Sequence, residues 1–332
     1  MRSPSRRAHL FVLACAIAVQ LAACSGSSTS PTAEPQTADP PTITPAPTVT
    51  TAPDLVVLIS RAEPSSRLSQ TAAELAASSG LRFEVRAEFP EALGPEVRVL
   101  LVDSDFDGSA LAASHPDVAL VQLGGQADGP ANLVNLRQAD GSALQASFVA
   151  GYVGALITPN YRVGAVFVEA SPLASELAAA FTHGVQYYCG LCRAAYPPFA
   201  AYPLTVTTSE APSPEQIGAV LETLENAGVR TVYLAPPLAN SDLALRLAEQ
   251  GIMLVASDLT AEAATSATAA VIQPTPETVL RSIWEPLLAG ETEAHYVIPL
   301  AISQGNENLL SDSRLRLVEQ VLADVQAGFI SP

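Results

Sequence analysis

An acidic stretch with one aromatic residue offers the clearest binding chemistry in the sequence. It follows an apolar run of strand length and reads Asp103-Ser104-Asp105-Phe106-Asp107-Gly108. Its carboxylates can accept hydrogen bonds from ligand hydroxyls or amines, and its aromatic ring offers a stacking surface. Two plainer interpretations are a solvated turn and part of a calcium loop, although the later ligands and the closing Glu of such a loop are missing. We expect Asp103, Ser104, Asp105 and Phe106 to line a binding cleft.

Other candidate residues also stand at the ends of apolar runs. Gly124 and Gly125 follow one run, where their backbone N–H groups can approach a ligand or simply form a tight turn. Asp258 ends another run and either faces a ligand or caps a helix. Arg61 follows the first run and can pair with a ligand carboxylate or phosphate, or form a salt bridge at a rim. All four are candidates for the same cleft.

Cys189 and Cys192 form a CxxC pair and are the only cysteines beyond position 24. Redox CxxC pairs sit at a helix N-terminus, where the helix dipole lowers the thiol pKa. This pair instead follows a helix predicted to end at Tyr188, so we expect a structural disulfide. Zinc would need two further ligands, and the histidines are scattered, so we expect no metal and no cofactor.

Catalytic motifs are missing from the sequence. It contains no G-x-S-x-G elbow, P-loop, HExxH or G-x-G-x-x-G. It also contains no lysine, which excludes Schiff-base and lysine-nucleophile chemistry. We therefore do not expect an enzyme.

The charge balance excludes two classes of partner. The formal net charge is -17, and without the three arginines of the N-terminal leader the chain carries 13 basic against 33 acidic residues, or -20. A surface this negative repels nucleic acid and anionic lipid head groups. DNA binding and polybasic membrane docking are therefore not expected.

Residues 1–23 are typical of an export signal. Arg2, Arg6 and Arg7 precede an apolar segment that ends at Leu21. This segment is too short for a helix that spans the bilayer, which needs about 20 apolar residues. Leu21-Ala22-Ala23-Cys24 looks like a bacterial lipobox, in which the leader is cleaved and Cys24 carries lipid. Ordinary signal cleavage is the plainer alternative. We expect a lipid-anchored protein of the cell membrane, facing the periplasm or the cell exterior.

Residues 24–53 are predicted to be a tether. Seven prolines stand there among Ser, Thr and Ala, with almost no large apolar side chain. Such a segment buries too little surface to fold, and its prolines favour an extended path of about 3.1 Å per residue.

The rest of the chain alternates between strand and helix patterns. Continuous apolar runs of strand length stand at residues 55–59, 97–102, 118–123, 163–168, 229–234 and 252–255. Strands that are apolar on both faces belong to parallel sheets covered by helices. Between them, helical spacing begins after Ser171 (N-cap) with Pro172 at N1, and again at the capping box that opens with Ser213. The fold class is α/β, with parallel sheets flanked by helices.

The length after the tether predicts two lobes. We assign residues 54–157 and about 258–297 to the first lobe, and residues 158–257 and about 298–332 to the second. Several crossovers would join the lobes and leave a ligand cleft at the carboxyl ends of the strands.

Several segments resemble the basic membrane protein (BMP) family of ABC-transporter substrate-binding lipoproteins, whose well-known members bind purine nucleosides. Residues 147–156, SFVAGYVGAL, resemble that family's "FLAGYLAG" helix, and residues 162–167, RVGAVF, its "KVGFVGG" strand. Residues 181–185, FTHGV, resemble the "F..GF..G" helix, and residues 255–258, VASD, the "GvDsD" strand end. The likeness runs in order through nearly all of residues 54–332 and implies a type I periplasmic-binding-protein-like fold.

The sequence departs from the family at its binding segments. The loop after the first strand has no aromatic residue, Asn or Asp, and the family's ligand-contacting lysine is absent. Where the family has Gly-Gly after the crossover strand, this chain has Glu169-Ala170, which makes Glu169 a further cleft candidate.

The resemblance implies a monomeric receptor that captures a small polar solute, nucleoside-like or other, by lobe closure. It would deliver this solute to an ABC permease and ATPase. The alternative is a degenerate member of the family that acts as a sensory or protein-interaction module without transport.

Overall fold

The computed structural model describes residues 54–61, 66–89, 93–125, 128–190, 196–257 and 262–332. The predicted leader, Cys24, the tether, Cys192 and Asp258 lie outside these ranges. The disulfide between Cys189 and Cys192 therefore stays a prediction.

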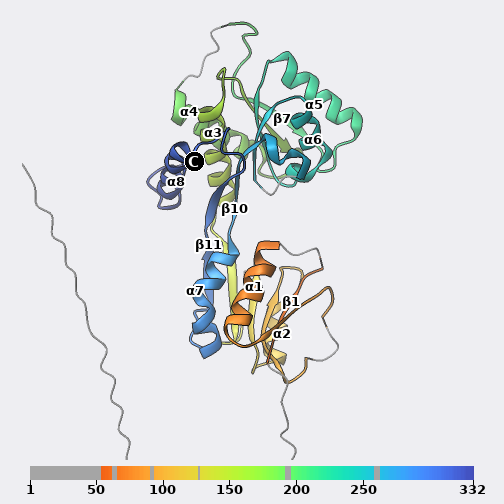
Figure 1. Cartoon of the computed structure of the whole chain (residues 1–332), viewed down its shortest axis with the longest axis vertical. Helices are drawn as coiled ribbons and strands as arrows, with labels where there is room; N and C mark the ends of the chain where they lie inside the picture. Colours follow the sequence, from red (N-terminus) through yellow and green to blue (C-terminus); the bar gives the residue numbers. More distant parts are fainter. Residues whose placement is uncertain (1–53, 62–65, 90–92, 126–127, 191–195, 258–261) are drawn as a thin grey trace, which may run out of the picture. The chain divides into compact units, whose positions relative to one another are not determined.

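The first sheet has six strands that all run parallel, in the order β11-β5-β4-β3-β1-β2. Its strands are β1 (Leu55–Ile59), β2 (Arg82–Arg86), β3 (Val97–Val102), β4 (Ala119–Leu123), β5 (Leu133–Gln138) and β11 (His295–Ile298). Helices α1 (Ser66–Ser78) and α7 (Pro276–Ala289) cover one face, as Figure 1 shows, and α2 (Gly108–Ser114) packs on the other. This sheet is therefore buried on both faces, as the apolar runs predict.

The second sheet also has six strands, in the order β12-β10-β9-β8-β6-β7, and only β12 runs antiparallel to its neighbour. Its strands are β6 (Val163–Val168), β7 (Leu204–Thr208), β8 (Thr231–Leu234), β9 (Met253–Ala256), β10 (Thr268–Pro274) and β12 (Leu300–Gln304). One face is covered by α3 (Ser142–Ile157), α4 (Ala174–Cys189) and α8 (Asp312–Gln326). The other is covered by α5 (Pro214–Asn226) and α6 (Asp242–Glu249). Short 3-10 helices η1 (Leu238–Asn240) and η2 (Glu262–Ala267) complete this lobe.

The chain passes between the two sheets three times, after β5, after β10 and between β11 and β12. The third passage is the single residue Pro299. Its carbonyl oxygen accepts two hydrogen bonds from Thr275, one from the backbone N–H (3.0 Å) and one from Oγ1 (3.1 Å). Two of the three crossovers are thus bonded to each other.

The expected lobe boundaries need two corrections. We assigned residues 142–157 to the first lobe, but α3 packs on the second sheet, where its side chains belong to one core with those of β6 and α4. We also assigned residues 258–274 to the first lobe, whereas β10 pairs with β9 and β12 in the second sheet. Helix α3 is buried along almost its whole length, so it has no polar face from which its neighbour could be predicted.

Two glycines let α3 and α4 approach closely. A Cβ on Gly151 would overlap the carbonyl oxygen of Phe181, and a Cβ on Gly184 would overlap that of Phe148. The hydroxyl of Ser147 in the same helix pair donates to the carbonyl oxygen of Leu177 at 2.7 Å. Both glycines lie in the two helix segments that resemble the family, residues 147–156 and 181–185, so those segments describe helix packing in the second lobe.

The helix-start predictions have two different outcomes. The capping box at Ser213 is confirmed, with both of its reciprocal hydrogen bonds to Gln216 in place. The predicted N-cap at Ser171 is wrong, because α4 begins at Ala174 with Leu173 as its N-cap residue. The segment from Ser171 to Leu173 forms a loop after β6, which gives these side chains another use.

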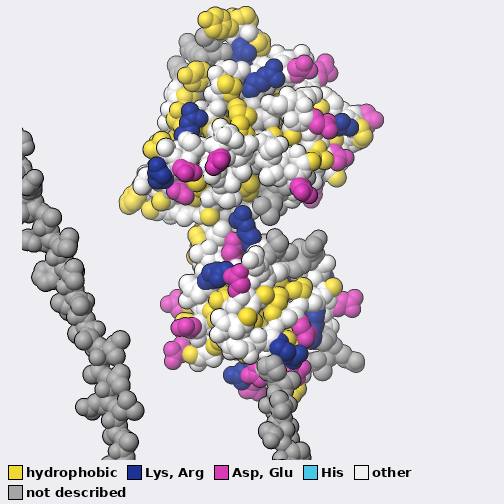
Figure 2. Space-filling view, in the orientation of Figure 1, with side chains coloured by type: hydrophobic (Ala, Val, Ile, Leu, Met, Phe, Trp, Pro, Cys, Tyr) yellow, Lys and Arg dark blue, Asp and Glu magenta, His cyan; other side chains and the backbone are white. Residues whose placement is uncertain are grey.

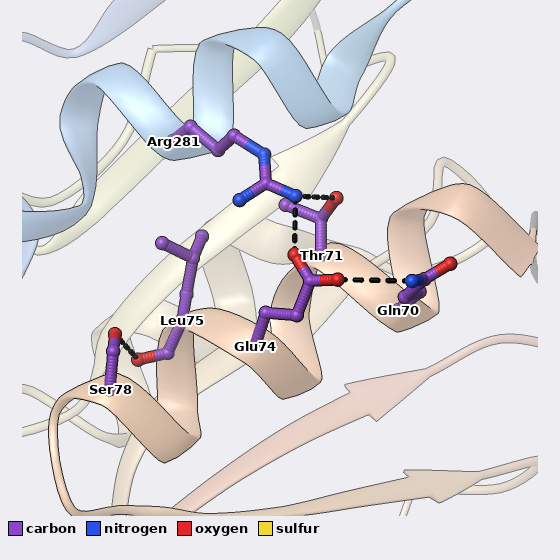
Figure 3. A network of polar contacts seen from close by, with 6 residues as sticks. All are labelled: Gln70, Thr71, Glu74, Leu75, Ser78 and Arg281. Atoms are coloured by element: carbon purple, nitrogen blue, oxygen red, sulfur yellow. Dashed lines mark hydrogen bonds and ion pairs between the residues drawn. The ribbon is translucent and has the colours of Figure 1, made fainter.

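Helices α1 and α7 are joined by a polar network (Figure 3). Arg281 of α7 donates to Glu74 (2.6 Å) and Thr71 (3.1 Å) of α1, and Gln70 donates to the other carboxylate oxygen of Glu74 at 3.0 Å. Beside it, Trp284 is 2 % exposed and its Nε1–H donates to Ser79 at 2.9 Å, so its side chain belongs to the core of the first lobe. The network fixes a late segment of the chain to the first helix.

Two surface properties complete the description. On the face drawn in Figure 2, arginine and acidic side chains are interspersed over both lobes. Among the described residues, no helix is both long enough and apolar enough to cross a membrane.

Candidate functional site

The first sheet reverses its strand order between β1 and β3, since β2 adds on one side of β1 and β3 on the other. Loops after such neighbouring strands diverge to opposite faces and leave a crevice at their carboxyl ends, where ligands of open α/β sheets bind. Arg61 follows β1 and Asp103 follows β3, so both stand at this switch point. The loops after parallel strands share one edge, so these two residues stand together although they are far apart in the sequence.

Arg61, Asp103, Asp105 and Phe106 contact one another at this edge. The backbone N–H of Arg61 donates to Asp103 Oδ2 (3.3 Å), and that of Asp105 donates to Asp103 Oδ1 (3.1 Å). The Arg61 guanidinium carbon lies 4.9 Å from the centre of the Phe106 ring, which is cation–π geometry. Both oxygens of Asp103 and one ring face of Phe106 are thus already engaged within the cluster.

The neighbouring turns explain Ser104, Gly124 and Gly125. Gly124 has φ +75°, and a Cβ there would lie 3.3 Å from Cβ of Ser104, so the loops after β3 and β4 touch. Gly125 is buried, and a Cβ there would overlap the amide oxygen of Asn135. A larger residue at position 125 would have to displace the Asn135 and Gln122 side chains, so this glycine keeps the turn closely packed.

The second sheet has its own switch point, between β6 and β8. A cavity of about 290 Å³ lies there, at the carboxyl ends of the strands. Its lining comes from the loop after β6, the ends of β8, β9 and β10, the first turns of α3, helix α4 and the start of β12: Ser142, Ala143, Ala146, Ser171, Leu173, Leu177, Tyr233, Pro236, Ser257, Ile272, Pro274 and Leu300, with Gln138 at the end of β5. One cavity is thus formed at a position where this sheet type binds ligands.

Tyr233 is the most buried polar side chain of that cavity. It is 3 % exposed, and its ring stacks on Phe181 with the centroids 5.7 Å apart. Burial raises the pKa of its hydroxyl to about 12, against the opposing effect of a hydrogen bond with Ser257. Tyr233 is therefore a neutral hydroxyl at physiological pH.

The remaining candidates lie elsewhere or outside the described residues. Glu169 follows β6, but it is exposed and is not among the described residues that line the cavity; its backbone N–H donates to Thr208. Asp258 lies outside the described ranges. Within the described part of the chain, no cluster of His, Cys, Asp or Glu side chains is arranged to hold a metal ion.

Sequence reasoning missed the second-sheet cavity. Tyr233 and Ile272 lie inside apolar strands, and Ala146 lies in a helix buried all round, so all three look like core residues. One usable signal was the hydroxyl residue just beyond a strand, as at Ser171 after β6 and Ser257 after β9. The same reasoning that selected Asp103 after β3 would have selected both serines.

Solved structures share this fold. An ABC transporter solute-binding protein from Conexibacter woesei DSM 14684 has a TM-score of 0.60 at 13% identity, covering 84% of this chain and 98% of its own. A transcriptional activator of the comK gene from Bacillus halodurans has a TM-score of 0.56 at 11% identity, covering 84% of this chain and 100% of its own. An ABC transporter solute-binding protein from Aeropyrum pernix K1 has a TM-score of 0.54 at 13% identity, covering 84% and 94%. The chain thus has the two-lobed periplasmic-binding-protein-like fold.

Sequence comparisons give no closer relative. No family model matches the chain, and no curated protein matches it. Membership of the BMP family stays a proposal.

Proposed function

We propose that this protein is the substrate-binding protein of an ABC importer, held outside the cytoplasm by lipid on Cys24. The observation that carries the proposal is that both sheets present a site at their switch points. The first presents the cluster around Asp103, and the second presents the cavity around Tyr233. Two of the solved structures with this fold are ABC transporter solute-binding proteins, which supports the same role here.

Capture would work by lobe closure. A solute held by one lobe gains contacts with the other only when the lobes close, and this difference in affinity shifts the population toward the closed state. The three crossovers are short, so they can serve as the hinge. The tether of residues 24–53, at about 3.1 Å per residue, would let the receptor reach a permease and its ATPase from the membrane surface.

The finer proposal is a nucleoside-like solute or another small polar solute. It is supported by the order of motifs shared with the BMP family. The loop after β1 and the absence of lysine leave this chain without part of that family's binding groups. At the first-sheet edge, Phe106 is the aromatic residue among those described that could stack on a solute.

The test is to purify residues 54–332 from an expression host without refolding and to identify any retained solute by mass spectrometry. A thermal-shift panel of nucleosides, bases, sugars and amino acids follows. We expect at least one class to raise the melting temperature and to reduce the radius of gyration in X-ray scattering. The absence of any retained solute and of any shift would contradict the proposal.

The anchor has its own test. Cys24→Ala should abolish incorporation of labelled palmitate and move the protein from the membrane fraction to the soluble extracytoplasmic fraction. Cys15→Ala, within the leader, is the matched control and should leave both unchanged. Labelling of the Cys24→Ala variant would contradict lipidation at this residue.

A sensory or protein-interaction module is the second candidate. Two observations favour it: Arg61 already covers a face of Phe106, and the fold is shared with the Bacillus halodurans transcriptional activator. Affinity capture from the native membrane distinguishes the two functions. Recovery of a permease and an ATPase supports import, and recovery of a membrane kinase supports sensing.

A further inference from the structure

The second-sheet cavity has a selective lining. Its polar groups are the hydroxyls of Ser142, Ser171, Ser257 and Tyr233, with the amide of Gln138 at its edge. None of these groups carries charge. The hydroxyls of Ser142 and Ser257 already donate to Gln138 Oε1 (3.1 Å) and to the carbonyl oxygen of Leu234 (3.1 Å), so toward a ligand these two hydroxyls accept hydrogen bonds. The rest of the described lining consists of aliphatic side chains and prolines.

No described lining residue is basic. The chain has no lysine to supply a cation, and its net charge is -17. Arg61 is the arginine of the first-sheet cluster, and its guanidinium group lies over the Phe106 ring. A carboxylate or phosphate group in the cavity would therefore lose its hydration and meet only the partial positive charge of the α3 N-terminus, with no cationic side chain beside it. The field of the whole protein would oppose its entry.

The apolar part of the lining forms both the base and the mouth of the cavity. Ile272 and Leu300 are buried, whereas Leu173 is 45 % exposed although it lines the same cavity. A ligand that covers this exposed leucine removes apolar surface from water, which stabilises the complex. The volume, about 290 Å³, is just below the roughly 300–1,000 Å³ of small-molecule pockets, which suits a single ring.

We infer that the captured solute is an uncharged, single-ring compound with one apolar face, and that anionic solutes are excluded. The inference rests on the proposed function, because it names the solute class of that site. The hydroxyl and amide groups of the lining orient the polar edge of the ring, and the aliphatic side chains contact its face.

The test compares matched probes by isothermal titration calorimetry on residues 54–332. Three sets differ mainly in charge: benzyl alcohol, benzylamine and benzoate; glucose, glucosamine and glucuronate; uracil and orotate. In any set that binds, the neutral member should bind at least about tenfold more tightly than the anion. An anion that binds as well as its neutral partner overturns the inference. A cation that binds more tightly than the neutral member overturns it as well and would point to an acidic group at the site.

A charge-placement variant locates the effect in the cavity. Ser171→Asp adds a carboxylate to the lining. It should weaken binding of the neutral compound in each set several-fold and strengthen binding of the ammonium compound. Ser175→Asp adds the same charge on an exposed face of α4 outside the described lining and should leave the order of affinities unchanged. Equal effects of the two variants would contradict the assignment to this cavity. Circular dichroism confirms that both variants fold.

The outcomes separate this inference from the proposed function. A retained or binding solute that is anionic leaves the solute-receptor proposal standing and overturns only the inference about its class. Binding of no member of any set, with no solute retained from the host, contradicts the proposed function and the inference together.

Discussion

Tyr233 illustrates how one residue reports on its surroundings. It combines a buried aromatic ring, packed against Phe181 and Phe167, with a hydroxyl at the edge of the second-sheet cavity. Water is largely excluded from the ring, so ionisation of the hydroxyl is disfavoured. The residue therefore serves both the core and the candidate site.

Tyr233 should give the protein a specific loss of stability at high pH. Its pKa rises from 10.0 to about 12 on folding, so its contribution is complete below pH 10 and is lost as the pH rises toward 12. Two pKa units correspond to about 3 kcal/mol. Between pH 9 and 11.5, the free energy of unfolding of the wild type should fall more steeply than that of Tyr233→Phe in urea titrations.

The control for this prediction is Tyr161→Phe, at a position that is 53 % exposed. It should keep the steep pH dependence of the wild type. Identical slopes for the wild type and Tyr233→Phe would show that the Tyr233 hydroxyl is not buried in the folded protein.

The first-sheet residues could be predicted and most of the cavity residues could not, for a physical reason. Charged side chains such as Asp103 and Arg61 interrupt an apolar run and mark a strand end. Ile272 and Ala146 serve the core and the cavity with the same apolar surface. A sequence pattern records that they avoid water, but it does not record whether a side chain or a cavity lies beside them.

At the scale of elements, α3 and α4 cross closely in the second lobe. Gly151 and Gly184 lie in two of the four segments that resemble the BMP family. Because each glycine faces backbone atoms of the other helix, the crossing requires both. Motifs of this kind predict the fold well and carry little information about the ligand.

Gly184→Ala should destabilise the protein, because the new methyl group would overlap the Phe148 carbonyl oxygen and force the helices apart. Overpacking of this kind costs about 1–3 kcal/mol, and rigid backbone atoms leave little room for relaxation. Gly218→Ala in α5 is the matched control, since no atom lies within 4 Å of its Cβ position. It should stabilise the protein by about 0.5–1 kcal/mol.

Urea unfolding followed by circular dichroism measures both variants. The two substitutions are chemically identical and both lie in helices, so helix propensity acts in the same direction in each. We expect the free energy of unfolding to fall in Gly184→Ala and to rise in Gly218→Ala. Stabilisation by Gly184→Ala would contradict the close crossing of α3 and α4.

The link between α1 and α7 should depend on acid pH. Hydrogen bonds from Arg281 and then Gln70 lower the pKa of Glu74 below 4.5. A lowered pKa contributes stability above the unfolded value and loses it as the pH falls through the folded one. Glu74→Gln should therefore lower the urea midpoint slightly at pH 7 and lower it less at pH 3.

The effect is small because both side chains are about half exposed and water screens the pair. Glu285→Gln, at an exposed position of α7 with no ion pair among the described residues, is the control and should leave the midpoint unchanged at both pH values. If Glu74→Gln lowers the urea midpoint equally at pH 7 and pH 3, the effect comes from packing and not from the charge of Glu74.

Strand prediction succeeded or failed according to burial. All six predicted strands, such as residues 55–59 and 163–168, are present and lie inside the two sheets. Four of the six missed strands, β2, β7, β11 and β12, are sheet edges, where polar and apolar residues mix. The other two, β5 and β10, are interior, but Asn135 and the Ala pair of β10 weaken their strand pattern.

At the scale of the whole molecule, Thr275 joins two of the crossovers between the sheets. Its backbone N–H and its hydroxyl both donate to the carbonyl oxygen of Pro299. In a two-lobed protein, such a bond sets the stiffness of the connection.

Thr275→Val keeps the shape of the side chain and removes the hydroxyl bond. We expect a loss of about 1 kcal/mol in the free energy of unfolding, because the Pro299 oxygen retains the backbone bond. Thr278→Val, at an exposed position of α7, should change stability by less than half of that. Equal effects in chemical denaturation would show that the Thr275 hydroxyl bond contributes nothing.

The crossovers also impose an order on folding during synthesis. The first sheet needs β11, and its covering layer needs α7, yet both are encoded after all but one strand of the second sheet. A growing chain therefore cannot complete its first lobe until residue 298 has emerged, when only the last 34 of 332 residues remain. The first lobe therefore stays incomplete while most of the chain is being made.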